Sequence, residues 1–223
     1  MPFEPSDDFP FHTPGQPQVR PYGAEASMLD CLASGQSARA REMILHASAI
    51  ANVAVTDVVV GARSVVVIHG AADGVSIRDI LRDVSFQEQL SYPSDSREVT
   101  EIAVRYDGDD LDSVAKQCGM TTGEVVALHT AADFVVEFCG FAPGFAYLTG
   151  LPAALVLPRR TTPRARVSAG SVAIAAHYSA VYPRESPGGW HLLGTTTHEL
   201  WDINRRPPAT LQPGMRVRFV ELA

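Results

Sequence analysis

The order of hydrophobic and polar positions in the first ninety residues predicts a small α+β unit. Residues 36–53 and 76–89 carry apolar side chains at helical spacing, which is typical of amphipathic helices. Short β-branched and apolar runs predict strands. These runs span residues 19–32, interrupted at Gly23, and residues 57–60 and 64–68, which a tight turn separates as in a hairpin. We expect this unit to end in the polar, turn-rich stretch at residues 91–96.

The second half of the chain begins with a strand at residues 99–106 and a short helix at 110–118 that ends at Gly119. Thr121 and Glu124 have the spacing of a capping box, which predicts that another helix begins there. From residue 133 onward, short β-type runs alternate with glycine and proline, a pattern typical of a barrel or folded sheet with long loops. These runs are residues 134–138, 172–175, 192–193 and 217–222.

Composition narrows the class of protein. Hydrophobic residues make up 46% and charged residues 19% of the 223 residues, so a buried core is expected. The net charge of −7 argues against nucleic-acid binding, which normally requires a basic face. No apolar run approaches the length of a membrane span. Residues 1–18 carry acids and prolines and lack the features of a signal peptide, so we expect a disordered tail on a cytoplasmic protein.

The residue patterns also exclude several kinds of site. Cys31, Cys118 and Cys139 form no CxxC pair, so neither a disulfide framework nor a zinc knuckle is predicted. The histidines form no HxH or HxxxH pair, which leaves a metal site without support. Lys116 is the only lysine, and it has neither the glycine-rich run of a P-loop nor a buried serine partner. We interpret Cys139, in an apolar run, as a small buried hydrophobe.

Residues 140–150 hold three glycines, one proline and three aromatic residues in eleven positions. One interpretation is a rigid loop whose backbone approaches a ligand closely. The other is a loop that plugs one end of a barrel with its own aromatic side chains. The residues alone favour neither. The candidate ligand contacts in this segment are Phe141, Gly144, Phe145 and Tyr147.

Residues 158–166 place four arginines close to two prolines in an otherwise acidic chain. As a cluster they favour a contact with a carboxylate, a phosphate or an acidic partner, although any one of them alone is more commonly a solvated surface residue. Ser171, at a tight turn entering a strand, could donate to a ligand, but such a serine more often caps the turn.

In residues 182–191, Tyr182 and Arg184 are expected to face a site. Gly188 and Gly189 follow a proline and predict a turn with positive φ. Trp190 is then either a large anchor for a ligand or part of the barrel core. His129 lies near the end of a predicted helix, where the helix dipole favours its charged form and its neutral form could act as a base. A single histidine at a helix end is still more often structural.

In this order the segments closely resemble one family, that of the B subunit of 5-oxoprolinase, also called allophanate hydrolase subunit 1. The family includes the kinase inhibitor KipI and part of the C-terminal domain of urea carboxylase. The resemblance is strong from about residue 98 to the C-terminus. It departs from the family pattern at Ser168 and at three alanines where glycines are common, Ala173, Ala176 and Ala180. The matching residues are His129-Thr130, residues 140–148, Pro158-Arg159, Pro163-Arg164, residues 169–172, Tyr182-Pro183 and residues 187–190.

The resemblance implies an α+β fold: a small N-terminal α/β sandwich at residues 19–96, then a cyclophilin-like β-barrel at 97–223. It implies a heteromeric hydrolase that acts on a small amide, in which this chain is inactive without a C-type partner (allophanate hydrolase subunit 2) and in some systems an A-type partner. ATP with Mg²⁺ is the implied cofactor. The implied catalytic residues are His129, Tyr147 and Arg164. The implied substrate-binding residues are Phe141, Gly144, Phe145, Arg159, Arg160, Ser171, Tyr182, Gly188, Gly189 and Trp190.

Two other functions remain open at this point. The name allophanate hydrolase suggests hydrolysis of allophanate, but the chain shows no Ser-Ser-Lys amidase machinery. A KipI-like regulatory module, which inhibits a histidine kinase, is not excluded by any residue. ATP-dependent opening of 5-oxoproline is the function that we expect.

Overall fold

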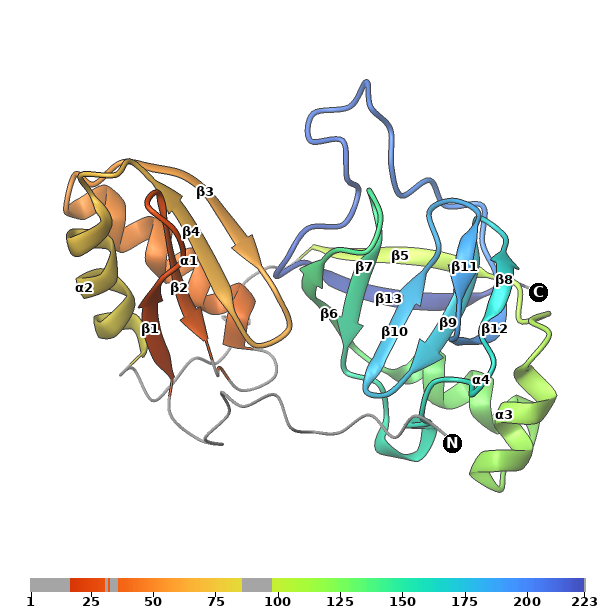
Figure 1. Cartoon of the computed structure of the whole chain (residues 1–223). Coiled ribbons are helices and arrows are strands. Elements are labelled where there is room, and N and C mark those ends of the chain that lie inside the picture. The colour runs from red at the N-terminus through yellow and green to blue at the C-terminus, as the bar shows by residue number, and fades with distance from the viewer. Residues whose placement is uncertain (1–16, 31, 33–35, 86–97, 223) are drawn as a thin grey trace. The chain divides into compact units, whose positions relative to one another are not determined.

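The computed structural model describes residues 17–30, 32, 36–85 and 98–222, and the chain divides into two compact units after residue 90. Figure 1 shows the order of the elements. The predicted domain boundary at residue 96 and most of the predicted tail lie outside the described residues. The two units are therefore considered one at a time.

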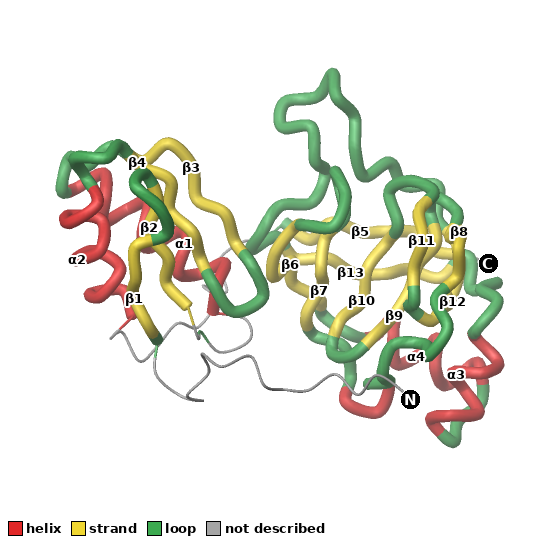
Figure 2. Tube along the Cα trace, viewed as in Figure 1, coloured by secondary structure: helices red, strands yellow, loops and turns green. Residues whose placement is uncertain are grey.

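The first unit is a four-stranded antiparallel sheet in the order β1-β2-β4-β3, with two helices packed on one face (Figure 2). In β4, Val65 and Val67 are buried against the helices while Ile68 is exposed on the other face, as the two-residue period of a strand requires. The predicted strands and helices of this unit are confirmed where the structure describes them, and residues 86–89 of the second predicted helix lie outside the described residues. Their bounds are β1 Gln18–Pro21, β2 Ala26–Asp30, α1 Gln36–Ile50, β3 Val55–Val60, β4 Val65–His69 and α2 Gly74–Ser85.

The second unit is built on a seven-stranded sheet in the order β12-β9-β10-β7-β6-β13-β5. Only β13 and β5 pair in parallel. Arg105 and Thr195 join the two edges, because each backbone N–H donates to the other residue's carbonyl at 2.8 Å. The sheet thus closes almost completely into a barrel. Its strands are β5 Val99–Val104, β6 Phe134–Cys139, β7 Ala146–Thr149, β9 Ser171–Ala175, β10 Tyr178–Val181, β12 His191–Thr195 and β13 Arg216–Glu221.

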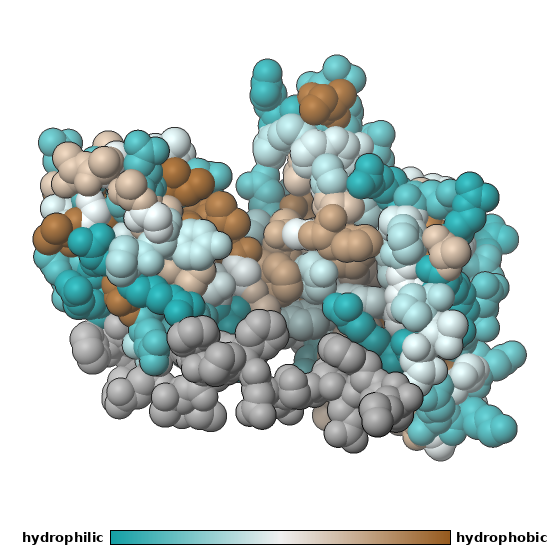
Figure 3. All heavy atoms as spheres, in the orientation of Figure 1, coloured by the Kyte–Doolittle hydropathy of each residue, from teal (hydrophilic) through white to brown (hydrophobic). Residues whose placement is uncertain are grey.

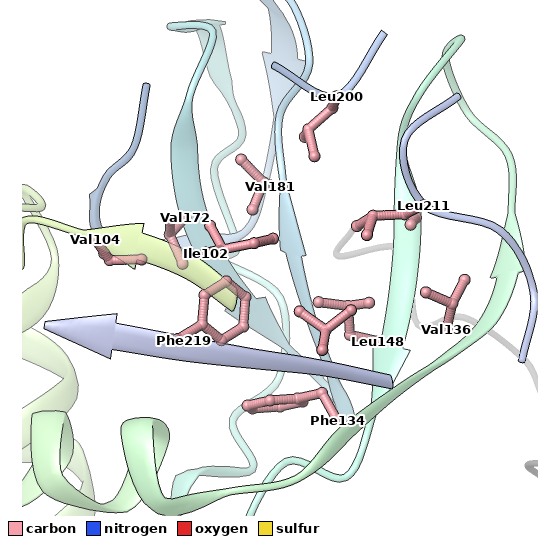
Figure 4. Packing of buried hydrophobic residues seen from close by; sticks show 12 residues of the cluster. Ile102, Val104, Phe134, Val136, Leu148, Val172, Val181, Leu200, Leu211 and Phe219 are labelled. Atoms are coloured by element: carbon pink, nitrogen blue, oxygen red, sulfur yellow. The ribbon is translucent and has the colours of Figure 1, made fainter. Parts of the chain in front are cut away.

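Inward-facing side chains from strands far apart in sequence fill the barrel (Figure 4). Phe134 from β6 and Phe219 from β13 meet edge to face, with ring centroids 5.2 Å apart. Both are almost fully buried, and each aromatic side chain buried in this way stabilises the fold by about 2 kcal/mol or more. The half-buried Cys139 packs against this core, as its interpretation as a hydrophobe requires, and burial raises the pKa of its thiol to about 11.

Two helices cover one side of the barrel: α3, Leu111–Cys118, and α4, Thr122–Ala131. Gly119 ends α3 with φ of 69°, a conformation that suits glycine. Thr121 and Glu124 form the predicted capping box at the start of α4. Both helix predictions are therefore confirmed. A short 3₁₀ helix, η1 (Ala153–Leu155), and a two-stranded ribbon, β8 (Arg164–Val167) with β11 (Ser186–Gly188), complete the unit.

Two local expectations were wrong. Residues 140–150 are not one loop, because the second half pairs with β6 and β10 as the strand β7. Pro187 and Gly188 lie in the strand β11 rather than in a turn, and neither Gly188 nor Gly189 has positive φ. The glycines and prolines in both places suggested loops or turns, whereas pairing with distant strands makes these residues extended.

Between β12 and β13 the chain forms a projecting arm, defined here as residues 199–210. Its two sides are joined by hydrogen bonds from the Asp202 amide to Pro208 at 3.0 Å and from the Thr210 amide to Leu200 at 3.0 Å. Near the end of this arm Figure 3 shows a hydrophobic patch among hydrophilic atoms. The side chain of Ile203 is 70% exposed. The arm is therefore a hydrogen-bonded element that presents an apolar side chain to solvent.

Candidate functional site

Aromatic and glycine residues at one end of the barrel surround a cavity of about 300 Å³, called here the aromatic cavity. All but one of its lining residues were candidates from the sequence, the addition being Pro187. The structure thus brings together side chains from three separate sequence segments. The lining residues are Phe141, Phe145, Tyr147, Arg159, Tyr182, Pro187, Gly188, Gly189 and Trp190.

The aromatic side chains hold one another edge to face. Phe145 and Trp190 have ring centroids 5.7 Å apart at 89°, and Phe145 and Tyr182 are 5.4 Å apart at 82°. Phe145, Tyr182 and Trp190 are each at most 4% exposed. The two interpretations of residues 140–150 therefore combine: the aromatic side chains fill the barrel end, and together they line a cavity there.

The turn before β7 depends on unusual backbone. Gly144 has φ of 81°, and a Cβ on it would lie 2.9 Å from Trp201 Cβ. Phe141 has φ of 71° although it is not glycine, and its side chain is 61% exposed. Such strain persists only where the surroundings enforce it, and it concentrates at functional sites. The exposed Phe141 ring forms the lip of the aromatic cavity.

Gly188 is required by space rather than by backbone conformation. A Cβ at this position would overlap the hydroxyl of Tyr182, whereas a Cβ on Gly189 would have 3.7 Å to its nearest neighbour. Gly188 therefore leaves room for the Tyr182 hydroxyl beside β11, where Tyr182 lines the cavity. Close packing thus explains a glycine that its sequence context had placed in a turn.

Arg159 supplies the charge of the aromatic cavity. Its guanidinium carbon lies 6.0 Å from the centre of the Trp190 ring, close enough for the positive charge to be attracted to the ring face. Among the described residues no carboxylate pairs with Arg159. Burial raises the pKa values of Tyr147 and Tyr182, and the charge of Arg159 only partly opposes this. Both phenols are therefore protonated near neutral pH and can donate hydrogen bonds.

The other arginines of the cluster have carboxylate partners, so the predicted anion site does not include all of them. Asp110 accepts from Arg160 at 2.5 Å and from both terminal nitrogens of Arg164 at 2.8 Å. It also accepts from the Leu192 amide at 2.8 Å. Burial alone would raise the pKa of Asp110, but these hydrogen bonds and charges lower it below its usual range. Arg166 pairs with Glu185 on the surface.

Asp110 is the functional residue that sequence reasoning missed. It was treated only as the first residue of a helix, and its arginine partners lie 50 and 54 positions away. We call this group of Asp110, Arg160 and Arg164 the aspartate clamp. Because the Arg160 amide also donates to Gly189 at 2.8 Å, the clamp fixes the segment that carries Arg159 beside the aromatic cavity.

His129 lies away from the aromatic cavity and is fully buried. Its Nδ1 is 2.7 Å from the Tyr106 hydroxyl, and its Nε2 is 2.9 Å from the Ser179 hydroxyl. Ser179 donates to the Ala173 carbonyl, so Nε2–H donates to Ser179 and Nδ1 accepts from Tyr106. Burial lowers the pKa of His129 to about 3, which outweighs the helix dipole that was expected to favour its charged form. The proton-transfer role of His129 stays a prediction, and its contacts are those of a structural histidine.

Ser171 and Arg164 border a separate cavity of about 500 Å³, which Asp107, Asp109 and Arg166 also line. Ser171 begins β9 and is 4% exposed, and its backbone amide donates to the Ser168 carbonyl at 3.3 Å, whereas the capping role of its hydroxyl stays a prediction. Arg184 is exposed and does not line the aromatic cavity. Arg164 does not line the aromatic cavity either, and its catalytic role stays a prediction.

A third cavity of about 670 Å³, called here the arginine cavity, lies between α3 and the arginine segment. Its lining residues are Ser113, Gln117, Pro158, Arg159, Arg160, Thr161, Thr162 and His191. Ser113 and Gln117 were not predicted, and their spacing of four on α3 is the only signal that could have placed them together. The described residues contain no cluster of metal-binding side chains and no helix long and apolar enough to cross a membrane.

Known proteins are similar to this chain in sequence and in fold. Residues 17–211 match the family model "Carboxyltransferase domain, subdomain C and D". A protein of Escherichia coli O157:H7, named as the B subunit of 5-oxoprolinase, is 40% identical over 169 residues, 74% of this chain and 78% of the relative. The solved structure of TTHA0988 has a TM-score of 0.72 at 33% identity and covers 92% of this chain. The K. lactis urea amidolyase, with a TM-score of 0.70 at 15% identity over 93% of this chain, shares the fold.

The fold and its barrel-end cavity define a cyclophilin-like barrel of the carboxyltransferase type. The chain belongs to the carboxyltransferase subdomain C and D family, the family of the 5-oxoprolinase B subunits. This chain spans 40% of the length of TTHA0988 and 15% of the urea amidolyase, so those proteins contain further polypeptide.

Proposed function

We propose that this chain is the B-type component of a 5-oxoprolinase complex and that its aromatic cavity binds the small cyclic amide. The observation that carries the proposal is the pairing of a single unneutralised guanidinium, Arg159, with aromatic walls in a cavity of about 300 Å³. The relatives named as 5-oxoprolinase B subunits, at 40–44% identity, support the choice of substrate class.

The chemistry of the cavity suits 5-oxoproline, a five-membered lactam that bears one carboxylate. Arg159 binds the carboxylate, since a guanidinium presents parallel donors to it. Tyr147 and Trp190 contact the apolar ring atoms. The hydroxyl of Tyr147 or Tyr182 donates to the lactam oxygen, because burial keeps both phenols protonated.

An unstrained lactam is a poor electrophile, and opening it at neutral pH calls for ATP. In the proposed reaction the lactam oxygen takes the terminal phosphoryl group of ATP and ADP leaves. Water then adds to the ring carbon, the C–N bond breaks to give an acyl phosphate, and a second water releases phosphate and glutamate. Bound Mg²⁺ would neutralise the phosphoryl charge during transfer. This chain positions the amide, and other polypeptides complete the site.

The need for a partner follows from what the cavity contains. Its described lining residues include no carboxylate, histidine, cysteine or lysine that could act as a general base. The exposed side chains of Phe141, at the cavity lip, and Ile203, on the arm, lie on the same unit. The arm also packs closely against the turn before β7, because a Cβ on Gly144 would lie 2.9 Å from Trp201 Cβ. We propose that the C-type partner of a 5-oxoprolinase docks here and that the A-type partner joins the assembly.

Reconstitution with the C-type and A-type partners tests this function. We expect release of glutamate from 5-oxoproline only with ATP and only with the partners present. Arg159→Gln should raise the KM for 5-oxoproline about tenfold or more, because a charge-assisted pair is lost. The matched control is Arg166→Gln, whose side chain is 79% exposed and pairs with Glu185.

Three outcomes would contradict the proposal. They are turnover by the chain alone, equal effects of the two arginine substitutions, and inhibition of a histidine kinase by the chain without any lactam turnover by the complex. The last outcome would favour the regulatory function. The remaining alternative, hydrolysis of allophanate, is tested by supplying allophanate in place of 5-oxoproline, with and without ATP, and measuring its turnover by the complex.

A further inference from the structure

The arginine cavity shares Arg159 with the aromatic cavity, so one guanidinium borders both. At about 670 Å³ it is more than twice as large as its neighbour. Hydrogen-bond donors line it on two sides. The residues that matter are Ser113 and Gln117 from α3, and Arg159, Arg160, Thr161 and Thr162 from the facing segment.

The charge in this cavity is positive. No carboxylate is among its described lining residues, although the chain carries a net charge of −7. Arg160 shares Asp110 with Arg164, so one carboxylate serves two guanidiniums. The buried Nε–H of Arg160 has no hydrogen-bond partner among the described residues. Arg159 has no ion-pair partner among them either.

We propose that the arginine cavity binds a polyphosphate anion, the triphosphate of a nucleotide, with Arg159 as the cation between this anion and the aromatic cavity. The oxygens of a polyphosphate accept many hydrogen bonds at once. Such a ligand therefore matches two guanidiniums flanked by threonine and serine hydroxyls better than a ligand with a single carboxylate would. The proposal rests on the proposed function only where it identifies the anion as the phosphoryl donor for a lactam bound in the adjacent aromatic cavity. Anion binding itself is independent of it.

Isothermal titration of the full chain with tripolyphosphate, and separately with ATP, tests the proposal without any amide or partner. Gln117→Glu places a negative charge on the exposed face of α3 beside the cavity. We expect this substitution to weaken tripolyphosphate binding roughly tenfold by charge repulsion. Gln212→Glu adds the same charge at an exposed position that lines none of the three cavities and should leave binding unchanged.

A second pair of variants removes a positive charge. Arg159→Gln should weaken binding about tenfold, whereas Arg166→Gln should not. Absence of saturable tripolyphosphate binding, or equal effects within either pair, would overturn the proposal. Binding of ATP without binding of tripolyphosphate would also overturn it, because recognition would then rest on the nucleoside. If Gln117→Glu weakens tripolyphosphate binding but the complex opens no lactam, only the proposed function is wrong.

Discussion

Ala176 occupies a backbone conformation that glycine adopts at lower cost. It follows β9 in the two-residue turn before β10 and has φ of 50°. The left-handed region costs an alanine roughly 1–2 kcal/mol. Glycine is common in the family at this position, and Ala176 is exposed and does not line the aromatic cavity.

Ala176→Gly is therefore expected to raise the free energy of unfolding by up to about 1 kcal/mol, after the added freedom of the unfolded glycine is subtracted. Chemical denaturation measures this. The control is Ala165→Gly, an exposed position in β8 without positive φ, where we expect a loss of about 0.5–1 kcal/mol. A loss of stability in both variants would contradict the strain argument.

Gly188 and Gly189 form a natural matched pair. Gly188→Ala forces a methyl group into the Tyr182 hydroxyl, so we expect a loss of about 1–3 kcal/mol from overpacking, together with altered ligand binding in the aromatic cavity. Gly189→Ala has room for its methyl group and should change stability much less. Thermal unfolding of the two variants compares their stabilities. Equal losses of stability would contradict the close-packing argument, because they would mean that the Tyr182 side chain moves aside at little cost.

The buried His129 predicts a pH dependence of stability. Its pKa of about 3 in the folded chain lies below its usual 6.5, so below pH 6.5 the unfolded chain binds a proton that the folded chain does not. Stability should fall by about 1.4 kcal/mol per pH unit from pH 6.5 toward pH 3.

The contribution of His129 to this slope should be lost in His129→Gln and retained in His46→Gln, which changes an exposed histidine of α1. Urea denaturation between pH 7 and pH 4.5 measures the difference between the wild-type and variant curves. A difference that stays constant with pH would mean that His129 is accessible to protons, as the predicted proton-transfer role requires.

At the scale of elements, the aspartate clamp joins three segments that the sequence keeps far apart: the start of α3, the arginine segment and β12. Removing one member of a buried ion pair leaves the others uncompensated. Asp110→Asn should lower the free energy of unfolding by about 3 kcal/mol at pH 7, near the low end for buried pairs because both guanidiniums keep some solvent contact.

The pH dependence of this loss has a definite sign. The pKa of Asp110 is lowered in the folded chain, so its contribution is present above about pH 4 and declines as the pH falls. The gap between wild type and Asp110→Asn should therefore shrink below pH 4. Asp109→Asn, whose side chain is 78% exposed and 4.0 Å from Arg164, should cost less than about 1 kcal/mol. Equal costs would contradict the clamp.

Most elements could be predicted because their signal is local. The capping box at Thr121 and the alternation in β4 depend on neighbours within a few residues. The strand β7 was missed because its pairing partners, β6 and β10, are set by the barrel and not by its own composition. Likewise, the motifs identified the lining of the aromatic cavity, but only distances distinguish Arg159, which has no carboxylate partner among the described residues, from Arg160 and Arg164, which share Asp110.

At the scale of the whole molecule, the arm should act in assembly and not in stability. Ile203→Ser replaces a 70% exposed side chain, so the free energy of unfolding should change by less than about 0.5 kcal/mol. Affinity for the C-type partner should fall about tenfold if Ile203 enters a pocket on that chain. Val220→Ser, at a 39% exposed position of β13, is the control. Unchanged affinity in the Ile203 variant would remove the arm from the interface.

The position of Arg159 between two cavities has a thermodynamic consequence. Two anions that draw on one cation each weaken the attraction left for the other, so occupation of either cavity lowers affinity in its neighbour. Reciprocity requires the same factor in both directions. A carboxylate ligand and a polyphosphate would then show negative cooperativity on this chain alone, and only a further positive charge, brought by Mg²⁺ or by another polypeptide, would relieve it.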